Sequence, residues 1–280
     1  MELKYIIDLD GTIYQQNRPI KFADKFISYL QKEGREFVFF TNSPEKSPLE
    51  LKLKLSGFNI DVSEKQIITS GQVAIDYLLC HNKNCTVFVI GTNQLKNDFS
   101  NSGFNVVDSK SKKADYVVCG FSRSVDFSDI EAACRYIWNG AKLICTNFDE
   151  SIPCENGLTP HTGAINASIE YATGEKAIVL GKPGSYTFEF LQNRLNAQKQ
   201  ELCVIGDRID IDMLFGKLNG IKSFLVYTGI TSEAEALDPK NHGLFDAGFK
   251  NLKQLMDFDK ELCQGPKPHY VFSAVPKESV

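Results

Sequence analysis

The chain has 280 residues, and its hydrophobic fraction of 42% is enough for a large core in one or two domains. Its 31 basic and 35 acidic residues give a net charge of −4, which argues against a general attraction to nucleic acid or to an anionic membrane. No apolar stretch approaches the roughly 20 residues needed to span a bilayer, and the first residues lead at once into a strand-like run, so we expect a cytoplasmic protein.

Short apolar runs alternate with amphipathic segments along the chain, which predicts an α/β fold with a doubly wound parallel sheet. We predict, in chain order, strand 4–7, helix 23–33, strand 36–40, helix 49–55, helix 72–79, strand 86–90, helix 94–100, strand 116–119, helix 129–138, strand 142–145, helix 164–173, strand 177–180, helix 186–195, strand 202–205, helix 211–217, strand 223–226 and helix 252–262. Ser128, with Glu131 three residues later, predicts a capping box for the helix at 129–138.

This alternation also predicts two domains. Residues 1–74 and 177–263 form a core, and residues 75–176 form a second α/β unit inserted into it. Residues 264–280 contain three prolines and are expected to form an extended tail.

The eight cysteines contain no Cys-x-x-Cys pair, and several lie in apolar runs, where cysteine packs as a small hydrophobe. Cys80, His81 and Cys85 lie close together, but no second Cys or His pair follows at the spacing of a zinc site. We therefore expect structural thiols in a reducing compartment.

The run from Asp8 to Thr12 is the most informative part of the sequence. Asp8 and Asp10 follow the strand at 4–7 and, because alternate side chains of a strand share a face, they leave it near one another. Gly11 allows the backbone to turn tightly behind them. Two carboxylates held close together repel unless a cation neutralises them, and a divalent metal is the simplest neutraliser.

Three further apolar runs end in polar residues: Thr41-Asn42 follows 37–40, Lys182-Pro183 follows 178–180, and Gly206-Asp207 with Asp212 follows 202–205. If these runs are parallel neighbours, all four clusters lie beyond the carboxyl ends of the strands, where open sheets bind ligands. Each cluster alone could be a turn, a helix cap or a surface lysine, but together and in this order they favour a functional site.

In this order, Asp8-x-Asp10-Gly11-Thr12, Thr41, Lys182 and Gly206-Asp207-x4-Asp212 resemble the four signatures of the haloacid dehalogenase (HAD) superfamily of phosphatases. The long interval between Thr41 and Lys182 resembles the NagD-like, p-nitrophenylphosphatase branch (subfamily IIA, with a C2-type cap), and so do Thr146-Asn147, the stretch at 157–163 and Gly181-Lys182-Pro183. The resemblance spans about residues 4–260. It implies a HAD-like Rossmannoid core at 1–74 and 177–263 and an α/β cap domain at 75–176.

The resemblance implies a Mg²⁺-dependent phosphatase that acts on small phosphate monoesters, such as sugar phosphates, nucleoside monophosphates, phosphoglycolate or p-nitrophenyl phosphate. Asp8 would form an aspartyl-phosphate, and Asp10 would act as general acid and base. The Asp8 carboxylate, the Asp10 backbone carbonyl and Asp207 would hold Mg²⁺, an oxygen-seeking cation. Thr12 would orient the loop and Asp10. Asp212 would contact a metal-bound water or Lys182 without being a protein ligand of the metal itself.

The remaining implied roles concern the substrate. Thr41, Asn42 and Lys182 would bind its phosphoryl group. In the cap, the loop at 146–163 would contribute specificity through Asn147 and His161, with Asp149 and Glu150 nearby, and the hinges would lie near 70–71 and 174–175. This chain has Ser43 and His161 where the branch commonly has an asparagine and a small residue, which bears on substrate identity.

The expected partner is a small phosphorylated metabolite, with no nucleic acid and no membrane, and a homodimer is an assembly that the sequence leaves open. Two alternatives also stay open at this point. A phosphotransferase or mutase would use the same aspartyl-phosphate but deliver it to another alcohol. A non-catalytic phosphate-binding module would only hold its ligand, although receiver-like modules are shorter and have no cap-sized insertion.

Overall fold

The computed structural model describes residues 2–154 and 157–264, so the predicted tail, apart from its first residue, lies outside the described residues. The chain forms two compact units. The first contains the residues up to Phe39, Ser56–Ile60 and the residues from Gln192 on, and the second contains Phe40–Leu55 and Asp61–Leu191. The predicted insert at 75–176 lies within the second unit, while the boundaries of a functional core and cap remain a prediction.

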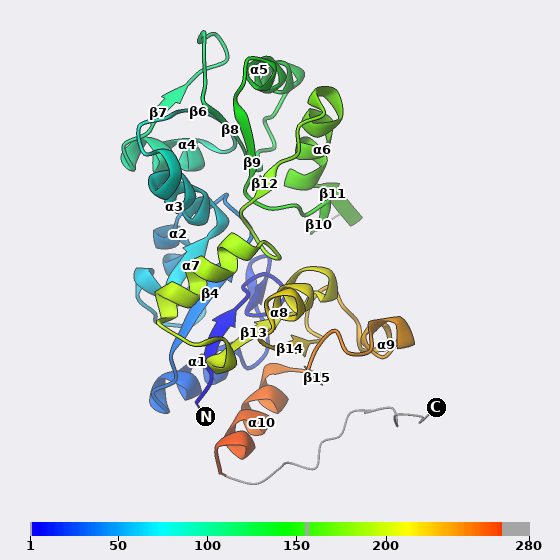
Figure 1. The fold of residues 1–280 in the computed structure, drawn as a ribbon. Helices are drawn as coiled ribbons and strands as arrows, with labels where there is room; N and C mark the ends of the chain where they lie inside the picture. The colour runs from blue at the N-terminus through cyan, green and yellow to red at the C-terminus, as the bar shows by residue number, and fades with distance from the viewer. Residues whose placement is uncertain (1, 155–156, 265–280) are drawn as a thin grey trace. The chain divides into compact units, whose positions relative to one another are not determined.

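A parallel sheet forms the framework of the first unit (Figure 1). Its strands are, in spatial order, β15 (Ala247–Phe249), β14 (Lys222–Val226), β13 (Leu202–Gly206), β1 (Lys4–Ile7) and β4 (Phe37–Thr41). A further short strand, β5 (Ile67–Thr69), belongs to the second unit. β1 pairs in parallel with both β13 and β4. Every residue of β4 and β13 is buried, as expected of a parallel sheet covered on both faces. The predicted α/β class with a parallel sheet is confirmed.

Helices pack on this sheet through apolar stripes. The helical segments of the first unit are α1 (Ala23–Lys32), the π-helical turn η3 (Ile209–Met213), α8 (Leu214–Asn219), α9 (Glu233–Ala236), α10 (Leu252–Gln264) and the 3-10 turns η2 (Lys199–Glu201) and η4 (Pro239–Asn241). In α1, Ala23, Phe26, Ile27 and Leu30 are buried, which is the spacing of one helix face. A hairpin, β2 (Tyr14–Gln15) with β3 (Arg18–Pro19), follows the Asp8–Thr12 run.

A buried carboxylate joins α10 to β1 and α1. Asp259 is 2% exposed and accepts hydrogen bonds from the hydroxyls of Tyr5 and Tyr29, the second at 2.8 Å. The Arg35 Nε atom lies 3.7 Å from the same carboxylate. Burial, and then the charge of Asp259, raises the pKa of Tyr5 well above its ordinary value. Because each partner compensates the burial of the others, this group holds three elements of the first unit together.

The second unit has its own parallel sheet (Figure 1). Its strands are, in spatial order, β12 (Ile178–Val179), β9 (Lys142–Cys145), β8 (Tyr116–Cys119), β6 (Thr86–Ile90) and β7 (Asn105–Val107). The other elements of this unit are η1 (Glu64–Gln66), α3 (Ser70–Asn82), α4 (Asn93–Asn101), α5 (Phe127–Trp138), α6 (Thr162–Thr173) and the antiparallel pair β10 (Ser151–Cys154) and β11 (Gly157–Pro160). Two helices, α2 (Pro48–Ser56) and α7 (Ser185–Leu195), have residues in both units.

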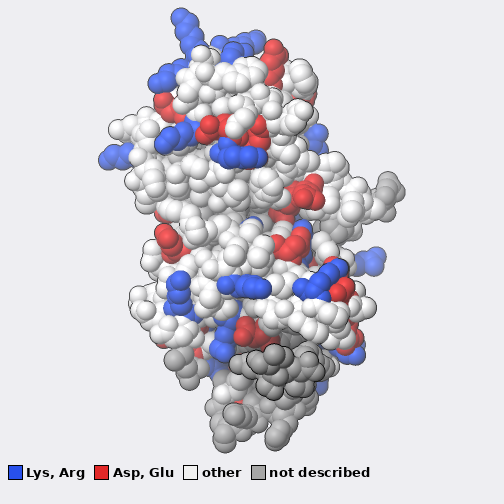
Figure 2. All heavy atoms as spheres, turned by 45° about the vertical axis from the view of Figure 1, so that its right-hand side comes forward, with Lys and Arg blue, Asp and Glu red and all other residues white. Residues whose placement is uncertain are grey.

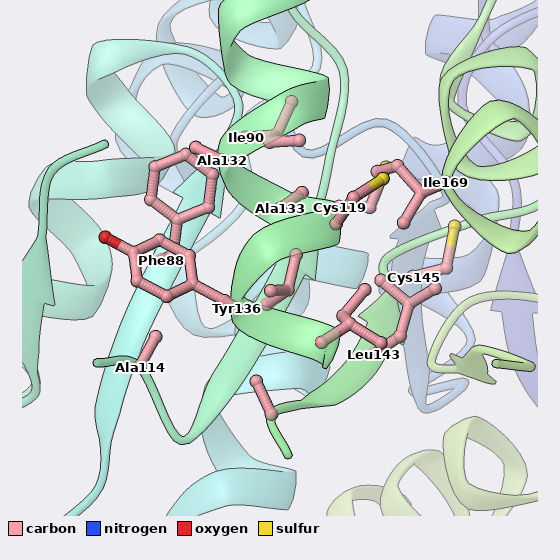
Figure 3. Packing of buried hydrophobic residues seen from close by; sticks show 14 residues of the cluster. Phe88, Ile90, Ala114, Cys119, Ala132, Ala133, Tyr136, Leu143, Cys145 and Ile169 are labelled. Carbon is pink, nitrogen blue, oxygen red and sulfur yellow. The ribbon is translucent and has the colours of Figure 1, made fainter. Parts of the chain in front are cut away.

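An apolar core fills the space between the second sheet and the helices α5 and α6. Figure 3 shows Phe88 and Tyr136 packed beside Ala132. Cys119, Cys145 and Ile169 belong to the same cluster. Their side chains come from strands and helices alike, so the second unit has a hydrophobic core of its own.

Two expectations about local structure were wrong. The strand predicted at 177–180 is β12, which pairs with β9 in the second sheet rather than joining the first sheet. Its apolar residues suit either sheet, and only long-range pairing decides between them. The helix α5 begins at Phe127, because Asp126 caps it in a reciprocal arrangement with Asp129, and Ser128 lies inside the first turn. Asp caps a helix as well as Ser does, so the helix begins directly after Asp126.

Acidic and basic side chains lie interspersed over the face shown in Figure 2. Among the described helices, none combines the length and the apolar composition that crossing a membrane requires. The cysteines with described side chains are free thiols, and Cys85, Cys119, Cys134, Cys145 and Cys203 are buried. Burial raises the pKa of Cys145 and Cys203 well above the usual thiol value, as expected of packing residues.

Candidate active site

Three buried carboxylates gather at one edge of the first sheet. Asp8 directly follows β1 and Asp207 directly follows the adjacent strand β13, so parallel pairing places both at the same sheet edge. Asp212 lies in the π-helical turn η3, whose backbone turns so that the Arg208 N–H donates to the Asp212 carboxylate at 3.1 Å. One oxygen from each of these three residues lies within 4.8 Å of the other two, and their exposed fractions are 9%, 2% and 1%.

The chemistry of this cluster suits a hard divalent cation. Like charges at such distances repel strongly where water is excluded, and the repulsion falls when a cation lies among them. Carboxylate oxygens are also the ligands that Mg²⁺ and Ca²⁺ prefer. Asp8, Asp207 and Asp212 therefore fit a metal of this class by donor type, burial and mutual distance.

Glycines leave room for the carboxylates. Gly11 has a φ of 84°, and a Cβ atom there or at Gly229 would collide with the carboxylate of Asp207. A Cβ at Gly206 would collide in the same way with Asp212. Only glycine avoids both the collision and the backbone strain at Gly11.

The loop at 227–231, after β14, holds Asp207 and the Asp8–Thr12 run in place. The Ile230 N–H donates to Asp207 Oδ2 at 2.7 Å, and the Thr228 hydroxyl donates to the Gly11 carbonyl at 2.7 Å. Sequence reasoning missed this loop. The signal was available, since a Thr-Gly pair follows the apolar strand at 223–226 in the same way as the polar clusters follow the other strands.

Asp10 and Thr12 occupy different environments. Asp10 is exposed, and the hydroxyl of the buried Tyr14 donates to its Oδ2 atom at 3.3 Å. Burial, and then the charges of Asp10 and Asp8, raises the pKa of Tyr14 well above its ordinary value. Thr12 is fully buried, and its hydroxyl has no hydrogen-bond partner among the described residues. Tyr14 therefore makes a hydrogen bond to Asp10, while the expected role of Thr12 in orienting the loop and Asp10 stays a prediction.

The second unit brings the predicted phosphate-binding residues together. Lys182 is 1% exposed, and its backbone N–H donates to Asn42 Oδ1 at 2.7 Å, while Asn42 Nδ2 donates to the Lys182 carbonyl at 3.0 Å. The Lys182 Nζ atom donates to the Phe40 carbonyl at 3.4 Å. Thr41 is also buried, and its hydroxyl accepts the Ser43 N–H at 3.1 Å. The segment that ends β4 and the segment that follows β12 therefore form one cluster within this unit.

The predicted cap residues extend this cluster. Asn42 Nδ2 donates to the Asp149 carboxylate at 3.3 Å, and Asn147 Nδ2 donates to the same carboxylate. Asn147 also donates to His161 Nδ1 at 3.1 Å, and the His161 ring stacks on Phe121 with ring centres 4.3 Å apart. Asn147 and His161 are fully or almost fully buried. The sequence singled out Asn147, Asp149 and His161 as separate candidates, but it did not predict the hydrogen-bonded network that joins them.

Comparison with known proteins agrees with this arrangement of residues. Residues 5–105 match the family described as haloacid dehalogenase-like hydrolase, and residues 179–251 match the family described as HAD-hydrolase-like. The 5'-nucleotidase YutF of Bacillus subtilis is 31% identical over 84% of this chain and 90% of its own length. The acid sugar phosphatase of Staphylococcus epidermidis is 33% identical over 81% of this chain and 87% of its own length.

Solved structures extend the likeness to the fold. The p-nitrophenyl phosphatase from Archaeoglobus fulgidus has a TM-score of 0.86 at 30% identity, covering 92% of this chain and 99% of that one. A putative nagD protein has a TM-score of 0.82 at 29% identity, covering 92% and 98% of the two chains. Since the likeness in sequence and in fold covers nearly the whole length of both partners, the chain belongs to the haloacid dehalogenase-like hydrolases, within their NagD-like branch of phosphatases.

Proposed function

We propose that this phosphatase is Mg²⁺-dependent and hydrolyses small phosphate monoesters through an aspartyl-phosphate on Asp8. The buried cluster of Asp8, Asp207 and Asp212 carries the proposal, because a nucleophilic carboxylate beside two further acids needs a cation before an anionic phosphate can approach it. The relatives support the substrate class, since they are named for a 5'-nucleotidase, an acid sugar phosphatase and a dihydroxyacetone phosphatase.

The proposed reaction has two steps. In the first, an Asp8 carboxylate oxygen attacks phosphorus and the bond from phosphorus to the ester oxygen breaks, while Asp10 gives its proton to that oxygen, so that a neutral alcohol leaves. In the second, a water oxygen attacks the same phosphorus and Asp10 takes a proton from the water. The bond from phosphorus to Asp8 then breaks, and orthophosphate and the free Asp8 carboxylate are formed.

We assign the metal to the carboxylates of Asp8 and Asp207 and the backbone carbonyl of Asp10, with Asp212 beside them. When bound, Mg²⁺ would offset the repulsion between Asp8 and the substrate and polarise a phosphoryl oxygen. For the phosphoryl group we assign the Lys182 ammonium, together with Thr41 and Asn42. Burial of Lys182 supports this role, because a lysine is rarely buried so completely without an anion to bind or a charge to offset.

Substrate choice is assigned to the loop at 146–163 in the second unit. Asn147 is hydrogen-bonded to His161, and both Asn147 and Asn42 donate hydrogen bonds to the Asp149 carboxylate. A change at His161 is therefore expected to alter KM among substrates more than it alters the turnover of a good leaving group. A phosphate-release screen over 5'-nucleotides, sugar phosphates, dihydroxyacetone phosphate, phosphoglycolate and p-nitrophenyl phosphate, on the wild type and His161→Ala, measures this directly.

The central experiment compares four proteins in p-nitrophenyl phosphate hydrolysis: wild type, Asp8→Asn, Lys182→Ala and the control Asp246→Asn. Asp246 is a carboxylate of the same unit as Asp8 that accepts the Ser223 N–H at 2.8 Å. We expect Asp8→Asn to abolish turnover, Lys182→Ala to lower it by orders of magnitude and the control to retain it. Removal of metal with EDTA should abolish wild-type turnover, and added Mg²⁺ should restore it.

Several outcomes contradict the proposal. Full activity of Asp8→Asn would overturn the nucleophile, and full activity in EDTA would overturn the metal. A brief reaction followed by acid quenching should leave a hydroxylamine-sensitive phosphoryl label on wild type and none on Asp8→Asn. Phosphate that appears on an added alcohol instead of in solution would indicate a phosphotransferase, and no turnover in a folded, Mg²⁺-saturated sample would indicate that the chain only binds phosphate.

A further inference from the structure

Tyr14 fixes the position of an exposed acid from a buried place. The Asp10 side chain is exposed, so without a partner it would exchange among its staggered conformations. Tyr14 is 2% exposed, and its hydroxyl donates to Asp10 Oδ2 at 3.3 Å. A proton donor anchored in the protein thus reaches the carboxylate of an exposed side chain.

The backbone around Tyr14 makes this anchor rigid. The Gly11 N–H donates to the Tyr14 carbonyl at 2.7 Å, and the Tyr14 N–H donates to the Leu9 carbonyl at 3.1 Å. Tyr14 also opens the β2–β3 hairpin, and its ring lies 6.1 Å from the ring of Phe58. The residue that holds the Asp10 carboxylate therefore also closes the turn that carries Asp10.

The hydrogen bond acts on the residue that moves the proton in the proposed reaction. Asp10 gives its proton to the departing ester oxygen, and this step requires that its carboxyl group be held within hydrogen-bond reach of that oxygen.

We propose that Tyr14 is a positioning residue whose hydroxyl holds the Asp10 carboxylate, by its Oδ2 atom, in the place from which Asp10 gives a proton to the leaving group. This inference rests on the proposed role of Asp10 as general acid. It predicts that Tyr14 matters in proportion to how much a leaving group needs a proton, which a purely structural residue would not do.

The test is a comparison of leaving groups. An alkyl phosphate such as glycerol phosphate must receive a proton as it leaves, whereas p-nitrophenolate leaves as a stable anion. We measure kcat/KM, which includes only the steps up to transfer of the phosphoryl group. Tyr14→Phe should lower kcat/KM for glycerol phosphate about tenfold relative to p-nitrophenyl phosphate, the order expected for loss of one hydrogen bond to a charged group. Asp10→Asn should show a larger loss of the same kind, about 10²–10⁴-fold.

The matched control is Tyr29→Phe. It removes a tyrosine hydroxyl that donates to another carboxylate of the same unit, Asp259, at 2.8 Å. This variant should leave the ratio between the two substrates unchanged. A double variant adds a second measurement: because Tyr14 acts through Asp10, Tyr14→Phe should cost nothing further on glycerol phosphate in the Asp10→Asn background.

The outcomes separate this inference from the proposed function. Equal losses on both substrates, no loss at all, or additive losses in the double variant would overturn the role of Tyr14 while leaving Asp10 as the acid. No leaving-group selectivity in Asp10→Asn itself would instead overturn the assignment of Asp10. Thermal unfolding and near-ultraviolet circular dichroism of each variant show whether it is folded, and the ratio between the two substrates is measured on the folded fraction, so that a loss of stability alone does not change it.

Discussion

The substitution Asp207→Asn should make the metal-free protein more stable while removing its response to Mg²⁺. With carboxylate oxygens within 4.8 Å, each pair of charges repels by about 3 kcal/mol at an effective dielectric constant of about 20. Asparagine removes the charge of Asp207 but keeps an oxygen for the Ile230 N–H. Because two of the three pairs contain Asp207, we expect a gain of up to about 6 kcal/mol in EDTA, which corresponds to roughly 10–20 °C in Tm for a chain of this size.

The wild type should behave in the opposite way. At a Mg²⁺ concentration 100 times Kd, binding to the folded state alone adds about 2.7 kcal/mol to the free energy of unfolding and raises Tm by roughly 5–10 °C. Differential scanning calorimetry in EDTA and in excess Mg²⁺ measures both effects without reference to activity. The control Asp246→Asn should keep the full response to Mg²⁺. A wild-type Tm that Mg²⁺ does not raise, or a response of Asp207→Asn as strong as that of the wild type, would show that Asp207 does not hold the metal.

Three further predictions concern the first unit. Gly229→Ala places a Cβ atom on the Asp207 carboxylate and should weaken Mg²⁺ binding about 10–100-fold by isothermal titration calorimetry, so unchanged affinity would contradict the described contact. Asp259→Ala leaves Tyr5 without its carboxylate partner and should cost about 3–5 kcal/mol in urea denaturation, and a cost under 1 kcal/mol would show that the buried group is dispensable. Burial raises the pKa of Tyr5 in the folded state, so its contribution to the free energy of unfolding is complete below pH 10 and falls above pH 10 by about 1.4 kcal/mol per pH unit. Tyr5→Phe should make the free energy of unfolding fall less steeply with pH in the alkaline range, and an unchanged dependence on pH would contradict this prediction.

Buried parallel strands were the most predictable part of the fold. The strands β1, β6, β8 and β9 have the predicted bounds, because each is a short apolar run that is covered on both faces and ends where the sheet ends. Strands of two or three residues, such as β7 and β15, were not predicted, since so few residues show no periodicity. β12 was found but placed in the wrong sheet, because pairing between distant segments leaves no local pattern.

The candidate site shows the same division between local and long-range information. The motifs singled out Asp8, Asp207 and Asp212, which lie together in the structure, although their roles remain predictions. Tyr14 and the loop at 227–231 were missed, since tyrosine after a turn and Thr-Gly after a strand are common and acquire meaning only through what they contact. The bond between Asn42 and the backbone of Lys182 could not be predicted either, because it joins segments far apart in the chain.

The central position of β1 in the first sheet has a consequence for synthesis on the ribosome. β1 is among the first segments to emerge, but one of its two neighbours, β13, emerges only after the whole second unit has been made. Until then one edge of β1 offers unpaired backbone groups to other chains, and Asp8 has no Asp207 beside it. A nascent or truncated chain that ends before residue 202 is therefore prone to aggregate and should not bind the metal. We expect activity to appear only after β13 has paired with β1.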